Sequence, residues 1–198
     1  MEATTKPRRW TYEEFARLPT SGSTRYEVIA GELVVTPGPW MRHQRIVGKL
    51  YQTLVAFVEA ERLGEVFLGP LDILFGVGDY LEPDLTFVRR DHAHLLAERG
   101  IEGAPDLVVE VLSPSTAKRD RGVKLERYRV YGVPEYWVVD PEARTIEVWQ
   151  LAEGASEPIV VGSADTLRWT PTSGGPTMEV RVADLFAAAW PEERSKGG

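Results

Sequence analysis

The feature that most constrains the fold is a short apolar segment, residues 106–112, with the sequence Asp-Leu-Val-Val-Glu-Val-Leu. A run dominated by valine and leucine favours a central β-strand that is covered on both faces. Ser113-Pro114 ends this strand, and a helical pattern follows from about residue 117 to residue 131. A buried strand that leads directly into a helix is typical of an α/β fold.

Glu110 is a charged residue inside this apolar strand, two positions before its end. A carboxylate that is buried without a cation or hydrogen-bond donors is energetically costly. Asp84 stands at the start of a second strand-like segment, residues 85–88. Because carboxylates from neighbouring strands commonly hold Mg²⁺, the sequence predicts a site for Mg²⁺ or Mn²⁺ at these two acids. In the alternative interpretation, Asp84 only begins a strand and Glu110 is an edge charge satisfied by other groups.

The remaining pattern predicts two hairpins, a long helix and several shorter elements. Thr11-Tyr-Glu-Glu14 is a capping box that opens a short helix. An amphipathic helix is expected over residues 40–62, with an apolar stripe formed by Ile46, Leu50, Leu54 and Phe57. Hairpins are expected at 25–35 and 135–149, and further strands at 65–68, 71–75, 158–161 and 166–169.

The chain is predicted to form a single domain over residues 1–190, followed by a disordered tail over residues 191–198. A length of 198 residues suffices for one well-buried core and is short for two. Residues 153–176 are rich in glycine, proline, serine and threonine, and a final amphipathic segment at 182–190 is predicted to pack a short helix on the core. No internal repeat or linker indicates a second domain.

Composition limits the class of protein. The chain contains no cysteine, which excludes a disulfide framework and a thiolate nucleophile. No secretory signal or membrane-spanning apolar run is visible, so we expect a cytoplasmic protein without a membrane partner. The net charge of −7 argues against nonspecific coating of nucleic acid, but it is compatible with carboxylates clustered around a metal ion. Four tryptophans indicate a self-association surface, so we expect a homo-oligomer, most simply a dimer: Trp137, Trp149, Trp169 and Trp190.

Several strings of the sequence together resemble the Uma-type family of restriction endonucleases, which belongs to the PD-(D/E)XK nuclease superfamily. They are Pro83-Asp84, residues 106–116, Lys124, Tyr128 and Gly-Val-Pro-Glu-Tyr-Trp-Val-Val-Asp at 132–140. The resemblance extends over residues 10–149 and includes Arg25-Tyr-Glu27, Gly31-Glu32 and His43. It implies a restriction-endonuclease-like three-layer α/β/α core with a mixed β-sheet and peripheral hairpins. It also implies a divalent metal and DNA phosphodiester bonds as the substrate, with Asp84 and Glu110 as the two motif acids.

One position departs from the superfamily pattern. Members usually carry a lysine two residues after the second acid, and this sequence has Leu112 there. An ammonium near the attacking water offsets developing negative charge, so catalysis requires a positive group from elsewhere. Lys124 shares a helix face with Asp120 and Tyr128 and stands where the family has its own lysine, whereas Lys118 is expected to face solvent. The alternative is a surface pair between Asp120 and Lys124.

Two further residues are candidates for the site. Glu27 aligns with an early glutamate of the family, which implies an additional acid at the metal site; pairing with Arg25 or Arg45 is the alternative. His43 is a candidate contact to the substrate phosphate, but a hydrogen-bonded core histidine fits its place on the helix stripe equally well.

Other acids and histidines are expected to lie apart from the metal. Asp106 is on the same strand face as Glu110, but four residues of strand span about 13 Å, so one small ion cannot take both. His92 and His94 belong to a polar stretch and are predicted to be solvated.

The residues and the resemblance together predict a metal-dependent nuclease in which Asp84, Glu110 and Glu27 bind the metal and Lys124 orients the attacking water. This hypothesis requires the Lys124 ammonium to lie within about 4 Å of a Glu110 carboxylate oxygen. The alternative is a catalytically inactive nuclease-fold module with a binding or structural role. A hydrolase of another phosphate ester is disfavoured, because no glycine-rich phosphate loop is visible.

Overall fold

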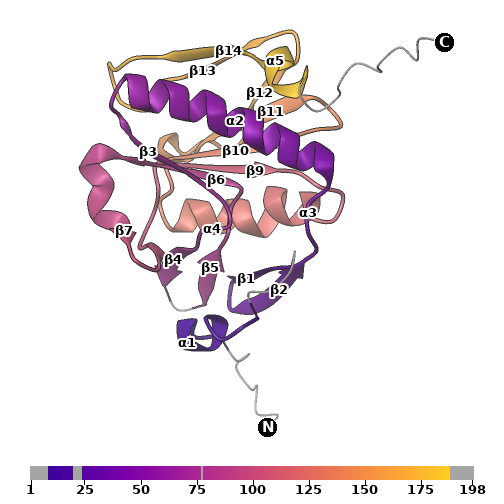
Figure 1. The fold of residues 1–198 in the computed structure, drawn as a ribbon, viewed down its shortest axis with the longest axis vertical. Helices are drawn as coiled ribbons and strands as arrows, with labels where there is room; N and C mark the ends of the chain where they lie inside the picture. Colours follow the sequence, from indigo (N-terminus) through magenta and orange to yellow (C-terminus); the bar gives the residue numbers. More distant parts are fainter. Residues whose placement is uncertain (1–8, 20–23, 77, 188–198) are drawn as a thin grey trace, which may run out of the picture.

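The structure is a computed structural model in which residues 9–19, 24–76 and 78–187 are described (Figure 1). The predicted tail, residues 191–198, lies outside the described residues, as do Trp190 and the last positions of the predicted final helix. The described residues form two sheets of six strands and one of two strands. None of the helices in this part of the chain is long and apolar enough to cross a membrane.

The central sheet contains the segment that the sequence singles out. Its strand order is β12-β11-β10-β9-β6-β3. The strands are β3 (Gly64–Leu68), β6 (Leu85–Arg89), β9 (Leu107–Val111), β10 (Glu135–Asp140), β11 (Thr145–Gln150) and β12 (Ile159–Gly162). β9 and β10 run parallel and the other neighbours are antiparallel, so the sheet is mixed, as predicted. All five residues of β9 are buried, which confirms a strand covered on both faces.

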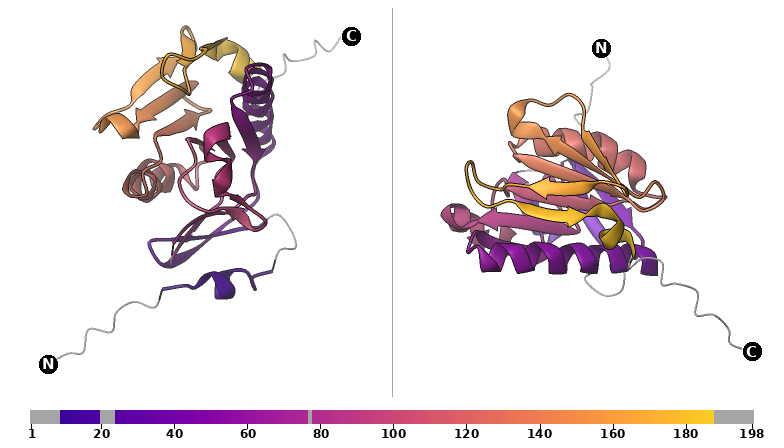
Figure 2. Two further views of the ribbon diagram at one scale, coloured as in Figure 1. Left: turned by 90° about the vertical axis from the view of Figure 1, so that its left-hand side faces the viewer. Right: turned by 90° about the horizontal axis from the view of Figure 1, so that it is seen from above.

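Helices cover both faces of the central sheet (Figure 2). α2 (Met41–Ala60) packs on one face, where its buried stripe joins Phe87 and Val109 in the largest core cluster. α4 (Leu125–Val130) covers the other face, where Tyr128 packs in a second cluster with Val108. The side chains of successive β9 residues therefore point alternately to α2 and to α4. The expected three-layer α/β/α arrangement is present.

The C-terminal segment adds to the α2 side of the core. β13 (Thr166–Trp169) and β14 (Met178–Arg181) form a separate hairpin, and α5 (Val182–Ala187) follows. The sequence predicted β13 and α5 but not β14, which is a short strand of four residues. This hairpin and helix lie beside α2 (Figure 1) and place buried side chains in the same cluster: Leu167, Trp169, Met178, Val182, Leu185 and Phe186.

The N-terminal hairpin that the sequence predicted is part of a second six-stranded sheet. Its order is β2-β1-β5-β4-β8-β7. The strands are β1 (Arg25–Ile29), β2 (Glu32–Thr36), β4 (Ile73–Gly76), β5 (Asp79–Leu81), β7 (Leu96–Ala97) and β8 (Gly100–Ile101). The predicted β1–β2 hairpin is confirmed, but it continues into β5. Three of the other strands are only two or three residues long, too short for their alternation to be recognised in a sequence.

The β1–β2 turn and α1 explain how the chain enters this second sheet. Ala30 and Gly31 have φ angles of 54° and 91°, the pair of positive values that a tight type I′ hairpin turn requires. The predicted capping box at α1 (Tyr12–Phe15) is confirmed, with reciprocal bonds between Thr11 and Glu14. α1 packs Phe15 against Tyr80 of β5, with ring centroids 5.4 Å apart. The remaining short helices are η1 (Arg90–Leu95) and η3 (Leu151–Glu153).

The sequence predicted one helix after β9. The segment is helical, but it is not one regular α-helix. It consists of α3 (Ala117–Arg119), a π-helical turn η2 (Asp120–Lys124) and α4. A π-helical turn contains more residues than an α-helical turn and is frequent at functional sites. Asp120 and Lys124 are both buried in this turn, so the alternative of a surface pair between them is wrong, although they lie 3.9 Å apart.

Three of the four tryptophans that indicated a self-association surface lie in the described part of the chain, and two of them are buried. Trp137 and Trp169 are buried in the main core, where their ring centroids lie 5.6 Å apart. Trp149 is partly buried against the second cluster. Trp137 and Trp169 therefore contribute to the interior of one chain, and the homo-oligomer stays a prediction.

Candidate active site

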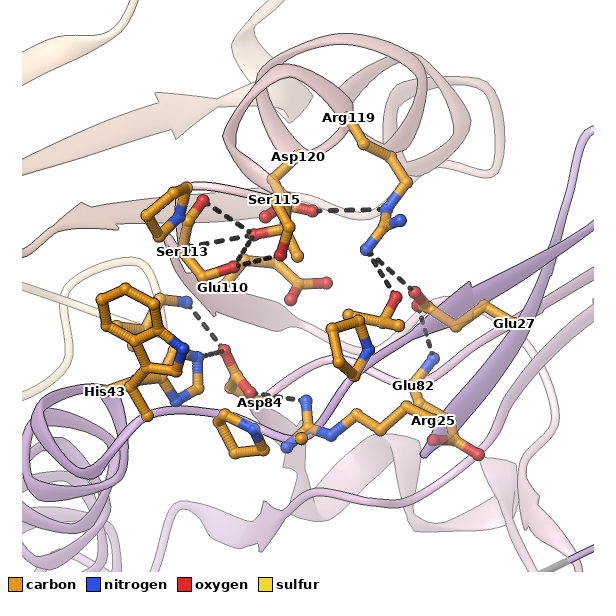
Figure 3. Close-up of a pocket in the computed structure, with 18 of the residues that line it drawn as sticks. Arg25, Glu27, His43, Glu82, Asp84, Glu110, Ser113, Ser115, Arg119 and Asp120 are labelled. Atoms are coloured by element: carbon orange, nitrogen blue, oxygen red, sulfur yellow. Dashed lines mark hydrogen bonds and ion pairs between the residues drawn. The ribbon is translucent and has the colours of Figure 1, made fainter. Parts of the chain in front are cut away.

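A pocket of about 260 Å³ is lined by residues from both large sheets and from the helices beside them (Figure 3). β1 provides Arg25 and Glu27, and α2 provides His43. Asp84 begins β6 after the turn that contains Glu82. The end of β9 and the helical segment that follows it complete the lining with Glu110, Ser113, Ser115, Thr116, Arg119, Asp120 and Lys124. All five candidate site residues of the sequence analysis thus line one pocket.

Asp84 is buried and its carboxylate has several donors. The Arg25 guanidinium lies 2.7 Å from Oδ1, His43 Nε2 lies 3.1 Å from Oδ2, and the backbone amide of Val111 donates to Oδ2 at 2.8 Å. Burial by itself raises the pKa of Asp84, but these partners outweigh it and lower that pKa to about 2. Asp84 is therefore a fixed anion, and the contact with Val111 ties it to the end of β9.

Glu110 is buried near the end of β9 and has the opposite tendency. Its Oε1 accepts hydrogen bonds from Lys124 Nζ at 2.7 Å and from the Tyr128 hydroxyl at 3.0 Å. Burial raises the pKa of Glu110 to about 8, against the pull of the Lys124 ammonium and with the help of nearby carboxylates. The two motif acids therefore differ: one is held ionised, and the other binds a proton readily.

Lys124 is the cation around which the acids gather. Its Nζ lies 2.7 Å from Oε1 of Glu110, 2.7 Å from Oε1 of Glu27 and 3.9 Å from Oδ1 of Asp120. Burial alone lowers the pKa of this ammonium, but the surrounding carboxylates raise it well above its usual value, so Lys124 is charged. The predicted contact with Glu110 is confirmed. Lys118 is exposed, as expected.

Glu27 binds Lys124 rather than either of the arginines considered from the sequence. Its Oε1 also accepts the backbone amide of Glu82 at 3.0 Å, and Arg119 lies 3.9 Å from Oε2. Arg25, two residues earlier on the same strand face, pairs with Asp84 instead. Glu27 therefore holds the lysine in place and connects β1 to the turn before Asp84.

The donor chemistry of the pocket fits a hard divalent cation. Asp84 and Glu110 offer carboxylate oxygens, which Mg²⁺ and Mn²⁺ prefer. Glu27 and Asp120 bring the number of buried carboxyl groups in the pocket to four, and Oδ1 of Asp120 has no hydrogen-bond partner. A cation added near Glu110 would relieve the repulsion that raises the pKa of that acid.

A three-acid metal site is not assembled, however. The described residues contain no group of three or more histidine, aspartate or glutamate side chains placed to hold a metal ion together. Glu27 and Glu110 both contact the Lys124 ammonium at 2.7 Å, so the ligand set of Asp84, Glu110 and Glu27 stays a prediction. Two carboxylates are sufficient for Mg²⁺ when water and substrate phosphate supply the other ligands.

Asp106 forms a separate buried contact. Its carboxylate accepts the backbone amide of Arg89 at 2.8 Å and lies 2.9 Å from Nδ1 of His92. His92 is thus paired rather than solvated, which corrects the sequence interpretation, whereas His94 is exposed as predicted. Asp106 does not line the pocket, as the strand spacing had indicated.

Sequence reasoning missed two arginines and a hydroxyl group cluster at this pocket. Arg25 could have been found, because it shares a strand face with Glu27. Arg119 donates to the Thr36 hydroxyl at 2.9 Å, but its buried Nε has no hydrogen-bond partner. The Ser113, Ser115 and Thr116 hydroxyls bond to one another at the pocket wall (Figure 3). Neither Arg119 nor these hydroxyls carries a spacing signal that a sequence could reveal.

Comparison with known proteins places the chain in a family. The family model Uma2, described as "Putative restriction endonuclease", matches residues 12–183. The chain belongs to the Uma2 family. A crystal structure of "a putative nuclease belonging to DUF820 from Anabaena variabilis ATCC 29413" superimposes with a TM-score of 0.75 at 22% identity, covering 91% of this chain and 99% of that chain. That likeness shows the fold, while comparison with curated proteins gives no match. The resemblance and the fold class expected from the sequence are both confirmed.

In this Uma2 family member, packing explains why the lysine is on a helix. Leu112 follows Glu110 on the same face of β9, the face that α4 covers, and Leu112 is buried among the apolar residues of that layer. A lysine at this position would have to place its ammonium among Leu125 and its neighbours. Lys124 reaches Glu110 from the helical layer itself, so Leu112 can remain apolar.

Proposed function

We propose that this protein is a divalent-metal-dependent endonuclease that hydrolyses phosphodiester bonds of DNA. The observation that carries the proposal is the buried Lys124 ammonium, 2.7 Å from both Glu27 and Glu110, in a pocket that also contains Asp84. A buried ammonium next to two carboxylates that differ in proton affinity is a combination suited to hydrolysis of a charged ester. Membership of the Uma2 family and the nuclease fold support the same reaction class.

Asp84 and Glu110 would hold Mg²⁺ or Mn²⁺, which when bound supplies Lewis acidity for the phosphate and lowers the pKa of a coordinated water. Lys124 would hold the attacking water by hydrogen bonding and offset negative charge on the phosphate. Glu27 is a positioning residue in this scheme, because it fixes the ammonium between two carboxylates.

The arginines and the histidine of the pocket would position the substrate. A guanidinium matches the geometry of a phosphate group, and the Nε of Arg119 has no hydrogen-bond partner, although Asp120 lies 3.9 Å away. Arg25 already neutralises Asp84 and lies at the pocket wall, so it can exchange that contact for a phosphate oxygen when a metal takes its place. His43 contacts Asp84 and is a further candidate for the phosphate, with its Nδ1 unpaired.

A second candidate function is a nuclease-fold module that binds a partner without cleaving it. The contacts of Asp84 favour this alternative, because Arg25, His43 and the Val111 amide already compensate its charge in the absence of a metal. The two candidates differ in one measurable property. A nuclease must bind a divalent ion at Asp84 and Glu110, and an inactive module need not.

Metal-dependent cleavage and metal-dependent stability together test the proposal. We expect the wild-type protein to cut DNA in Mn²⁺ or Mg²⁺ and to melt at a higher temperature in their presence, since ligand binding to the native state stabilises it. Glu110→Gln should remove cleavage while the protein remains folded. Replacement of both Asp84 and Glu110 by alanine should abolish the metal-induced rise in melting temperature.

Asp106→Asn is the matched control. It also removes a buried carboxylate at β9, but it lies outside the pocket, so cleavage and the response to metal should survive. An unchanged melting shift in the double alanine variant would place the metal elsewhere. A shift in the wild type without cleavage of any DNA form would favour the inactive module.

A further inference from the structure

An exposed tryptophan stands at the mouth of the pocket. Trp40 and Met41 are the two most exposed large apolar side chains among the described residues, at 68% and 69%. Trp40 lines the pocket together with Asp84 and Glu110, whereas Met41 does not. The indole of Trp40 is therefore available for contact with a ligand that enters the pocket.

The backbone around Trp40 is held in place before any ligand arrives. Trp40 is the N-cap residue of α2, in an extended conformation, and its carbonyl accepts the amide of Gln44 at 3.2 Å. Pro37 and Pro39 restrict the chain on its other side. One turn further along the helix, His43 contacts Asp84, so the backbone that carries the indole starts from the same end of α2 as the partner of that acid. A preorganised aromatic side chain loses little conformational freedom on binding.

The depth of the acids limits what can reach them. Asp84, Glu110 and Lys124 are 2%, 4% and 2% exposed, at the bottom of a pocket of about 260 Å³. In a DNA duplex both faces of each base are covered by stacking, and the backbone is held on a stiff rod. An unpaired strand can bend a phosphate into a pocket and turn a base face outward at the same time.

We propose that the substrate strand is unpaired at the cleavage site and that the indole of Trp40 stacks on a nucleobase next to the scissile phosphate. This inference rests on the proposed nuclease function and defines its substrate class. Stacking on an aromatic side chain tolerates any base, so Trp40 would select for an unpaired base rather than for a sequence. The net charge of −7 makes such a contact more important, because general attraction to phosphates is weak in an acidic protein.

Binding of labelled single-stranded and duplex oligonucleotides tests the inference, with fluorescence anisotropy as the readout. The Glu110→Gln protein in Mn²⁺ serves as the host, so that the strand is not cut. We expect the single strand to bind more tightly than the duplex. Adding Trp40→Ala should weaken single-strand binding roughly tenfold or more, as loss of one stacking aromatic does, and Trp40→Phe should restore much of it. Met41→Ala, equally exposed but outside the pocket, should change little.

Scanning an abasic nucleotide along the strand locates the contact. At one position the abasic substitution should weaken binding to the host and have no further effect on the Trp40→Ala variant. In the wild-type enzyme, Trp40→Ala should raise KM more than it lowers kcat. Equal affinity of the host and the Trp40→Ala variant, or preference for duplex, would overturn the stacking proposal while cleavage by the wild type still upheld the nuclease. Absence of both binding and cleavage for every DNA form would overturn both proposals.

Discussion

Two buried clusters of charged residues depend on the helical segment after β9, and they are built differently. In one cluster, four donors converge on the buried carboxylate of Asp79. Arg127 donates from Nε at 3.1 Å and from Nη2 at 2.7 Å, the Tyr131 hydroxyl at 2.7 Å, and the Ala30 amide at 2.7 Å. One acid has one cation and a full set of hydrogen bonds, and the cluster lines none of the described pockets.

The other cluster has incomplete hydrogen bonding. Glu27, Glu110 and Asp120 surround Lys124, and Arg119 lies 3.9 Å from Glu27 and from Asp120. Oδ1 of Asp120 and Nε of Arg119 have no hydrogen-bond partner. This cluster opens into the pocket. A carboxylate with complete hydrogen bonding away from a pocket is typical of a structural contact. Charged groups with unsatisfied hydrogen bonds beside a cavity are typical of a site that binds a ligand. The Asp79 cluster ties α4 to the second sheet, and the Lys124 cluster is available for chemistry.

The largest expected effect is a loss of stability when the acid of the first cluster, Asp79, is removed. Asp79→Ala removes the acceptor of four hydrogen bonds, and because Arg127 is only part-buried and stays hydrated, the free energy of unfolding should fall by about 3 kcal/mol. Denaturant unfolding measures this loss, and the metal-induced shift in melting temperature should remain. If Asp79→Ala costs no more stability than Glu110→Gln, the distinction between a structural and a functional cluster does not hold.

Lys124→Ala tests the second cluster through the rate of DNA cleavage. We expect cleavage to slow by about a hundredfold or more, the loss seen when one charge-stabilising group is removed. Metal binding should survive, because an ammonium is not a ligand. Lys118→Ala, an exposed lysine six residues earlier on the same helical segment, is the control and should leave the rate unchanged. Unchanged cleavage in Lys124→Ala would end the proposal that this lysine replaces the one missing at Leu112.

The acids of the second cluster should also make the stability of the protein depend on pH. The pKa of Glu110 is raised from 4.5 to about 8 and that of Glu82 to about 7, in both cases mainly by burial. An acid whose pKa is higher in the folded state stabilises that state below its unfolded pKa, and the contribution is lost as pH rises through the folded value. The metal-free protein should therefore lose stability between about pH 4.5 and pH 8.

Thermal unfolding at several pH values measures this slope. Glu110→Gln should flatten it, because the glutamine cannot ionise. Mn²⁺ should also flatten it, since the metal competes with the proton for the carboxylate. A slope that is the same in wild type and Glu110→Gln would contradict the raised pKa of Glu110.

The smallest effects come from a matched pair of tyrosines, one in each cluster. Tyr128→Phe removes one hydrogen bond to Glu110, and Tyr131→Phe removes one to Asp79. Each should cost about 1 kcal/mol of stability. Only Tyr128→Phe should change the pH dependence of metal binding, because its hydroxyl donates to Glu110, which we propose as a metal ligand. If metal binding has the same pH dependence in both variants, the hydroxyl of Tyr128 has only a structural role.

The parts of the fold that were predicted correctly are those governed by local pattern. Thr11 and Glu14 lie three residues apart and form the capping box that their spacing indicates. The stripe residues Ile46, Leu50 and Leu54 are buried, because a period of 3.6 residues directs them to one side of α2. The second sheet escaped prediction because strands such as β5 and β8 are too short to show alternation, and their pairing joins residues far apart in sequence.

The site shows the same division. Asp84 and Glu110 could be found because a charged residue is conspicuous in or beside an apolar strand. Lys124 could be found because it shares a helix face with Asp120 and Tyr128 and stands where the family has its lysine. The contact between Arg127 and Asp79 could not, since 48 residues separate them and neither position has an unusual neighbourhood. The partner of Glu27 was also beyond prediction, because β1 and η2 meet only through the tertiary structure.

The π-helical turn η2 has a consequence for changes in chain length. Each residue of an α-helix advances about 100° around the axis, and a π-turn accommodates an additional residue. That residue sets the phase between Arg119, which lies near Glu27, and the residues after the turn, Lys124 and Arg127, which face Glu110 and Asp79. Deleting one residue here, for example the exposed Gly122, would rotate Arg119 and Asp120 relative to Lys124 and Arg127 without altering any of them. The arrangement of charges around the ammonium can therefore be changed by a single-codon deletion that leaves every charged residue of the pocket in the sequence.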